Sequence, residues 1–147
     1  MTDTVSEQAA WMSHRVSYGE TDTMGVLYYA EYLHIFERGR SEFIREYGLS
    51  YKDVEARGLF LPVREAQCRY RQPARYDDLL MLHTVAADWR RASLCFQYRL
   101  YDESRSILIA EGFTQHACVA GNGKPIAIPV WFRELFSGPP LSAKKTL

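Results

Sequence analysis

The stretch YGETDTMGVLYYAEYLHIFERGRSEFIREY, residues 18–47, joins a polar, glycine-containing loop to the only long helical pattern in the chain. Its second half repeats apolar residues at the i, i+3, i+4 and i+7 spacings of a helix with one buried face. These positions are Tyr29, Tyr32, Leu33, Phe36, Phe43, Ile44 and Tyr47. The pattern predicts a helix over residues 30–47. Gly39 in its middle costs about 1 kcal/mol relative to alanine and therefore indicates close packing against a neighbouring segment.

The start of this helix has no obvious capping residue. The first four N–H groups of a helix lack partners inside it, and a preceding Ser, Thr, Asp or Asn usually caps them. Residues 26–29 are Val, Leu, Tyr and Tyr, and none of these can cap. In one interpretation the helix begins near Met24 and Asp22 is an ordinary N-cap. In the other it begins near Tyr29 and leaves free N–H groups facing a ligand, with the Asp22 carboxylate above them.

Composition bounds the class of protein. The chain has 147 residues, with 18 basic and 18 acidic side chains, so no net charge draws it to nucleic acid or to a membrane. No apolar run approaches a membrane span and no signal peptide is visible, so a cytoplasmic location is expected by default. The cysteines, Cys68, Cys95 and Cys118, are widely spaced and odd in number, which favours buried thiols over disulfides or a zinc site.

The rest of the chain reads mainly as strands joined by short turns. Candidate strands cover residues 11–18, 60–71, 79–89, 93–102 and 106–120, and short helices cover residues 50–57 and 130–136. Short turns favour antiparallel neighbours. The predicted class is α+β, with one antiparallel sheet wrapped around one long central helix. We expect a single domain over residues 1–147, with loose tails at about residues 1–10 and 138–147.

Residues 21–48, TDTMGVLYYAEYLHIFERGRSEFIREYG, resemble the N-terminal signature of the hot-dog-fold acyl-CoA thioesterases. The branch is the one that contains 4-hydroxybenzoyl-CoA thioesterase and the Tol–Pal-associated acyl-CoA thioesterases. The resemblance continues through FLPVREAQCRYRQPARYDDLL, DWRRASLCFQYRLYD and LIAEGFTQHACVAGNGKPIAIP, and covers roughly residues 14–135. It implies a hot-dog fold, an acyl-CoA substrate, no separate cofactor, and a homodimer that often pairs into a tetramer with its active site between subunits.

The resemblance also implies site residues. The family's catalytic carboxylate lies in a D-x-x-G loop, which Asp22 and Gly25 match, and it attacks the thioester carbonyl or activates water. The backbone N–H at Tyr29 would polarise that carbonyl, and preorganised N–H donors at a helix start suit a developing oxyanion. Glu31 departs from the family pattern, which usually has asparagine there.

Binding roles follow in the same way. The resemblance implies that Val26, Leu27 and Tyr28 shape the acyl end of the site, and that Arg90 and Arg91 hold phosphates of coenzyme A. Arginine suits phosphate because its planar fork donates two parallel hydrogen bonds. The alternative for two adjacent arginines at a strand bend is a solvated turn. Ala92 stands where the family's 4-hydroxybenzoyl branch has a lysine.

Several alternatives remain open from the sequence. Glu37 and Glu42 are competing carboxylates on the helix, with solvated or interface charges as the simpler interpretation. His34 with Glu37 gives a weak indication of a hydratase. A non-catalytic acyl-CoA or acyl-carrier binding module is a further alternative. The four histidines have no metal-ligand spacing, so no metal site is expected, and neither a nucleic-acid partner nor a membrane span is expected.

Overall fold

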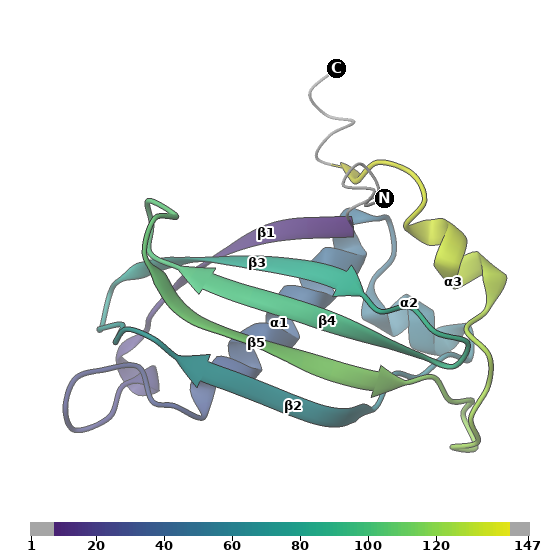
Figure 1. Ribbon diagram of the computed structural model, residues 1–147, viewed down its shortest axis with the longest axis horizontal. Helices are drawn as coiled ribbons and strands as arrows, with labels where there is room; N and C mark the ends of the chain where they lie inside the picture. Colours follow the sequence, from purple (N-terminus) through teal and green to yellow (C-terminus); the bar gives the residue numbers. More distant parts are fainter. Residues whose placement is uncertain (1–7, 142–147) are drawn as a thin grey trace.

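The computed structural model describes residues 8–141 and has the predicted α+β architecture. Five antiparallel strands form one sheet in the order β1-β3-β4-β5-β2, with helix α1 packed across one face (Figure 1). The strands are β1 (Gln8–Arg15), β2 (Val63–Tyr70), β3 (Leu79–Ala87), β4 (Ser93–Tyr101) and β5 (Leu108–Ala117). The helices are α1 (Glu31–Glu46), α2 (Tyr51–Ala56) and α3 (Val130–Leu135), and a 3-10 turn, η2, spans Tyr18–Glu20.

The first strand differs from its prediction. It was expected over residues 11–18, but it spans Gln8–Arg15 and residues 18–20 form the 3-10 turn. The predicted loose leader is therefore wrong for residues 8–10. The Gln8 side chain fixes this end, because its Oε1 accepts a hydrogen bond from Trp89 Nε1 (2.9 Å) and its Nε2 donates to the carbonyl of Phe136 (3.2 Å). Residues 1–7 and 142–147 of the predicted tails lie outside the described residues.

Helix α1 buries the apolar face that its spacing predicts. Phe36 stacks on Tyr98 of β4 with ring centroids 4.3 Å apart, and both side chains are fully buried. Gly39 lies against β3, as its position in the pattern predicted. A β-carbon built on Gly39 would approach Leu82 and would lie 2.8 Å from Thr84 Oγ1. The glycine therefore sets how closely α1 can approach the sheet.

Replacing Gly39 by alanine should destabilise the protein although alanine is the better helix former. Forcing an extra methyl into a packed core costs about 1–3 kcal/mol, which exceeds the gain of about 1 kcal/mol in helix propensity. We expect a lower urea midpoint for Gly39→Ala, with Glu42→Ala on the exposed face of the same helix as the control. A Gly39→Ala protein more stable than wild type would contradict this packing.

Strand β2 is an exposed edge of the sheet, paired only with β5. In an antiparallel ladder, alternate residues bond to the same neighbour. Arg71 N–H donates to the Ile109 carbonyl on the β5 side (2.8 Å). Gln67 lies four residues earlier, so its backbone groups also face β5. The backbone groups of Ala66 and Cys68 therefore face the open edge, where another strand could pair with them.

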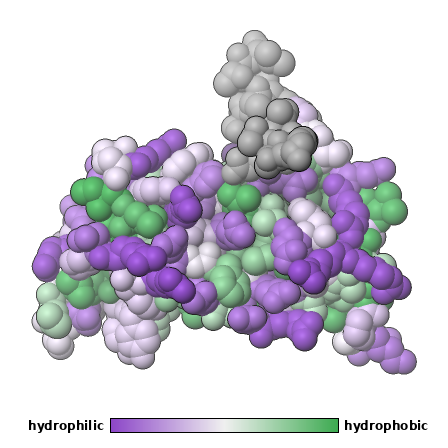
Figure 2. Space-filling view, in the orientation of Figure 1, coloured by the Kyte–Doolittle hydropathy of each residue, from purple (hydrophilic) through white to green (hydrophobic). Residues whose placement is uncertain are grey.

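The outer face of the sheet, opposite α1, has a mixed surface in which hydrophobic patches alternate with hydrophilic side chains (Figure 2). The ring of Trp11 lies 4.6 Å from that of His83 and under the guanidinium of Arg105. Within residues 8–141, no helix has the length and apolar character needed to cross a membrane.

Candidate active site

Asp22 organises a tight loop directly before helix α1. Its Oδ1 accepts hydrogen bonds from the N–H groups of Met24 (2.8 Å) and Val26 (3.3 Å), and its backbone carbonyl accepts one from Gly25 (2.9 Å). Gly25 has φ +78°, a conformation that glycine adopts without steric cost. The other carboxylate oxygen, Oδ2, has no hydrogen-bond partner among residues 8–141 and is available for chemistry.

Helix α1 begins at Glu31, after an N-cap residue, Ala30, whose side chain makes no capping bond. The structure combines parts of both interpretations of this start. Asp22 does cap a turn at Met24, but that turn is separate from the helix. Tyr29 lies before the helix, and its N–H has no backbone partner in the described part of the chain. An unpaired N–H close to the positive end of a helix is a ready hydrogen-bond donor for an oxyanion.

Backbone contacts attach this loop to the rest of the fold. Leu27 N–H donates to the Ala74 carbonyl (2.7 Å) and Tyr28 N–H donates to the Glu20 carbonyl (2.9 Å). Val26 forms an isolated bridge with Arg75. The segment between the loop and α1 is thereby held from two sides, which fixes where the Tyr29 N–H points.

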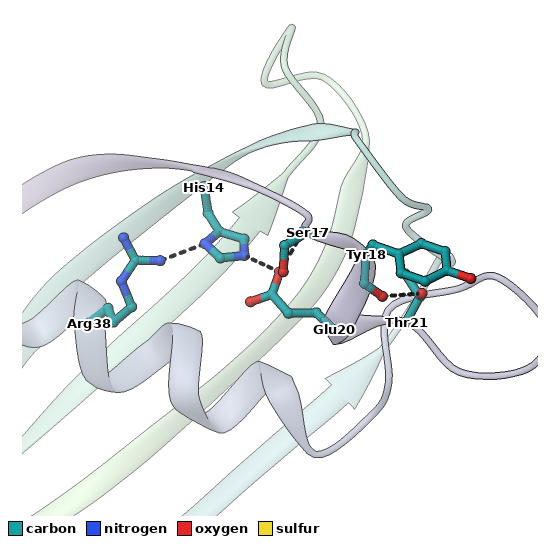
Figure 3. A network of polar contacts seen from close by, with 6 residues as sticks. All are labelled: His14, Ser17, Tyr18, Glu20, Thr21 and Arg38. Atoms are coloured by element: carbon teal, nitrogen blue, oxygen red, sulfur yellow. Dashed lines mark hydrogen bonds and ion pairs between the residues drawn. The ribbon is translucent and has the colours of Figure 1, made fainter.

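A network of polar contacts around the buried His14 supports the loop from behind (Figure 3). Arg38 of α1 donates to His14 Nδ1 (2.6 Å), so this nitrogen is an acceptor and His14 Nε2 carries the proton donated to Glu20 Oε1 (3.0 Å). Partial burial raises the pKa of Glu20, but hydrogen bonds from Ser17 N–H and His14 hold that pKa below its ordinary value. Because Glu20 also accepts Tyr28 N–H through its carbonyl, the network ties β1 and α1 to the loop.

The loop opens into a groove of about 380 Å³. Its lining is Asp22, Val26, Leu27, Tyr28, Tyr29, Tyr32, Tyr70, Arg71, Gln72 and Pro73. The groove therefore brings together five of the predicted residues, Asp22 and residues 26–29, and Gly25 forms the turn beside them. Leu27 is almost fully buried, whereas Tyr29 is 62% exposed.

Tyr32 and Tyr70 were not predicted as site residues. Their rings meet edge-to-face with centroids 4.8 Å apart, and the Tyr70 hydroxyl donates to the Tyr29 carbonyl (3.0 Å). Desolvation raises the pKa of both phenols to about 12, so both remain protonated at neutral pH. Tyr70 thus fixes the peptide plane of Tyr29 from the end of β2. Helical spacing marked Tyr32 only as a core residue, and no local pattern links Tyr70 to the loop.

The remaining predicted residues lie outside this groove. Arg90 and Arg91 lie in the β3–β4 turn, where Arg90 Nε is 3.2 Å from Asp88 Oδ1 and the Arg90 carbonyl accepts a hydrogen bond from Arg133. On α1, Glu37 lies 3.5 Å from His34 and Glu42 lies 3.4 Å from Arg45, all with exposed side chains. These two glutamates are far along the helix from Asp22 and carry ordinary surface pairings.

A second cavity, of about 260 Å³, lies between the middle of α1 and the start of β2. Its lining is Glu37, Arg40, Ser41, Ile44, Tyr51, Leu61, Pro62, Val63, Phe96 and His116. None of these was predicted as a binding residue. The sequence could not have assembled them, because they come from α1, α2, the segment before β2, and the strands β2, β4 and β5.

A chain of hydrogen bonds runs from this cavity into the core. Arg40 donates to the Tyr98 hydroxyl (3.4 Å), which lies 2.6 Å from Thr114 Oγ1, and that oxygen lies 2.8 Å from His116 Nε2. His116 Nδ1 lies 2.8 Å from the Leu61 carbonyl, so Nδ1 carries the proton and Nε2 is the acceptor. Burial lowers the pKa of His116 to about 4, which keeps this ring neutral at physiological pH.

The stability of the protein should fall as the pH is lowered through the range set by His116. Its folded pKa of about 4 lies below its ordinary value of 6.5, so the unfolded chain takes up the proton first. The contribution of His116 to the free energy of unfolding is complete above about pH 6.5. It falls toward pH 4 by up to about 1 kcal/mol for each pH unit. Urea unfolding at pH 7 and pH 5 measures the loss. His116→Gln should show a smaller difference between the two pH values, and an unchanged difference would assign the loss to other groups.

Known proteins resemble this chain in sequence and in fold. The profile of the thioesterase-like superfamily matches residues 16–136. An acyl-CoA thioesterase of Haemophilus influenzae is 35% identical over 117 residues, which cover 78% of this chain and 85% of that protein.

Two solved structures extend the comparison. A hypothetical protein of Thermus thermophilus has a TM-score of 0.81 and 37% identity, and the match covers 86% of this chain and 96% of that one. A 4-hydroxybenzoyl-CoA thioesterase crystallised with 4-hydroxybenzoyl-CoA has a TM-score of 0.79 over 88% of this chain and 99% of its own. Its sequence identity is only 21%, so its TM-score establishes a shared hot-dog fold and nothing further.

Proposed function

This chain belongs to the thioesterase-like superfamily, and we propose that it hydrolyses acyl-CoA thioesters to the free acid and coenzyme A. One observation carries the proposal. A single groove is lined by Asp22, whose Oδ2 has no hydrogen-bond partner among residues 8–141, by Tyr29, whose N–H has no backbone partner there, and by several aromatic side chains. A carboxylate beside a preorganised donor, in an apolar groove, meets the requirements of acyl transfer.

The chemistry divides between the two groups. Asp22 Oδ2 either attacks the thioester carbon and releases coenzyme A thiolate, leaving an acyl anhydride that water hydrolyses, or it takes a proton from a water that attacks directly. In both routes the thioester oxygen becomes negative and is stabilised by the Tyr29 N–H. The two N–H bonds to Asp22 Oδ1 hold the carboxylate in place during either step.

The groove favours an aryl or short acyl group. Tyr28, Tyr29, Tyr32 and Tyr70 provide flat apolar surfaces at its walls, and flat rings stack well on such surfaces. The coenzyme A phosphates would be held by Arg90 and Arg91, whose exposed guanidinium groups suit bidentate phosphate binding. These arginines do not line the groove of their own chain, and we propose that another copy of the chain supplies them.

A homodimer supplies that second copy. Strand β2 presents the unpaired backbone groups of Ala66 and Cys68 at the sheet edge, and two such strands can pair antiparallel about a twofold axis. The pairing would join two sheets into one and place the β3–β4 turn of the partner toward the Asp22 end of the first chain. Two dimers could then pack through their mixed outer faces to form a tetramer (Figure 2).

Thiol release in a dithionitrobenzoate assay tests the proposal. The purified protein should release coenzyme A from a panel of aryl, short and long acyl-CoA thioesters, with the highest kcat/KM for aryl or short chains. Tight binding of the same thioesters without thiol release would instead indicate an acyl-CoA binding module. Hydration of an enoyl-CoA substrate, without thiol release, would indicate a hydratase.

A further inference from the structure

We infer that the second cavity binds a carboxylate at the far end of the acyl group, and that it serves a substrate held in the groove of the other copy of this chain. The substrate class is therefore the monothioester of a dicarboxylic acid. This inference rests on the proposed thioesterase function and names the substrate of that same site. Arg40 is the specificity-determining residue.

Arg40 is placed to bind an anion. It is half-buried in a cavity of about 260 Å³, and among the described residues its one hydrogen bond is a long one, 3.4 Å, to the Tyr98 hydroxyl. No carboxylate lies within ion-pair distance of it in this part of the chain. A half-buried guanidinium with unused donors forms strong charge-assisted bonds with a carboxylate.

The groups around Arg40 do not pair with its charge, which leaves the guanidinium available to an incoming anion. Glu37 also lines the cavity, but its carboxylate faces His34 at 3.5 Å and is 57% exposed, which places it at the rim. The other polar lining groups are neutral. Ser41 contributes a hydroxyl, burial keeps the phenol of Tyr51 protonated by raising its pKa, and His116 is neutral because burial lowers its pKa.

The position of the cavity connects it to the second copy. The cavity lies at the start of β2, beside Val63, whereas the Asp22 groove lies at the end of β2, beside Tyr70. Antiparallel pairing of two β2 strands, with Ala66 of one copy against Cys68 of the other, brings Tyr70 of one copy next to the Val63 end of the other. Both hollows are lined by residues of α1 or its start, so they lie on the same face of the sheet. The groove of one copy thereby continues into the Arg40 cavity of the other.

Matched pairs of thioesters test the carboxylate preference. We compare 4-carboxybenzoyl-CoA with 4-methylbenzoyl-CoA, and adipoyl-CoA with hexanoyl-CoA. Arg40→Met should lower the carboxylate-to-neutral ratio of kcat/KM about tenfold to a hundredfold, the value of a lost charge-assisted hydrogen bond. Arg45→Met, the same change on an exposed part of the same helix, should leave the ratio unchanged. An unchanged ratio in Arg40→Met would overturn the inference.

Calorimetric binding measurements test the Arg40 cavity independently of the proposed thioesterase activity. On the Asp22→Asn background, Arg40→Met should weaken binding of 4-carboxybenzoyl-CoA more than that of its methyl partner, whether or not the wild type hydrolyses either. Absence of hydrolysis with this binding difference present contradicts the thioesterase and supports the cavity. Hydrolysis with no binding difference contradicts the cavity alone.

Mixed dimers test the contribution of the second copy. The Asp22→Asn and Arg40→Met variants should each hydrolyse 4-carboxybenzoyl-CoA slowly. If one site uses Asp22 of one copy and Arg40 of the other, a dimer that contains one of each variant has one wild-type site. Mixing the two variants by unfolding and refolding should therefore restore activity on this substrate. No recovery, in a mixture shown to contain mixed dimers, would contradict a shared site.

Discussion

Replacing Asp22 by asparagine is expected to lower kcat by about 10²- to 10⁴-fold, the usual contribution of a positioned base or nucleophile. Asparagine keeps an oxygen that can accept the Met24 and Val26 N–H bonds, so the loop should retain its shape. What it loses is the free anionic oxygen that either route of the reaction requires. Thiol release measures kcat, and calorimetry on the same protein should show acyl-CoA affinity close to that of the wild type.

Asp102→Asn provides a matched control. Asp102 also accepts backbone N–H groups in a tight turn, from Ser106 and Ile107 at 2.9 Å each, but it lies in the β4–β5 turn away from the groove. This variant should hydrolyse at the wild-type rate. Near wild-type turnover by Asp22→Asn would remove Asp22 from the chemistry.

Replacing Ala66 by proline is expected to give a folded monomer with kcat/KM reduced about a hundredfold or more, as when catalytic groups lose their positioning. The Ala66 N–H faces the open edge of β2, so proline removes no bond to β5 but blocks pairing with another strand. Light scattering measures the mass of the particle, circular dichroism its fold, and thiol release its activity.

Ala66→Val keeps the N–H and favours strand geometry, so this variant should remain dimeric and active. Gln67→Pro removes a donor on the β5 side and should instead lower stability. A dimeric Ala66→Pro protein would show that β2 is not the contact, and an active monomer would show that one chain holds the complete site.

Helix α1 was predictable because its signal is local. The apolar spacing around Phe36 and Phe43 predicted residues 30–47, and the helix spans Glu31–Glu46. Ser50 likewise predicted the start of α2, where its hydroxyl accepts the Asp53 N–H at 3.0 Å. The sheet faces followed from alternation in β3 and β4. The bounds of β1 were wrong because the partner that holds Gln8, Trp89, is far away in the sequence.

The candidate site was only partly predictable. The loop at Asp22 could be identified because its residues are contiguous and resemble a known signature. Tyr70 and the Arg40 cavity could not, because their relation to the site depends on which strands become neighbours. The network of His14, Glu20 and Arg38 could not be predicted for the same reason, because β1, a loop and α1 meet only in the folded chain.

The place of the thioester oxygen decides the central claim, that Asp22 and the Tyr29 N–H act together on a bound acyl-CoA. A crystal structure of Asp22→Asn with an uncleaved aryl-CoA measures it directly. We predict that the thioester carbonyl oxygen accepts a hydrogen bond from the Tyr29 N–H, with its carbon next to the residue 22 amide. A thioester bound elsewhere, or a Tyr29 N–H bonded within the protein when acyl-CoA is bound, would contradict the account.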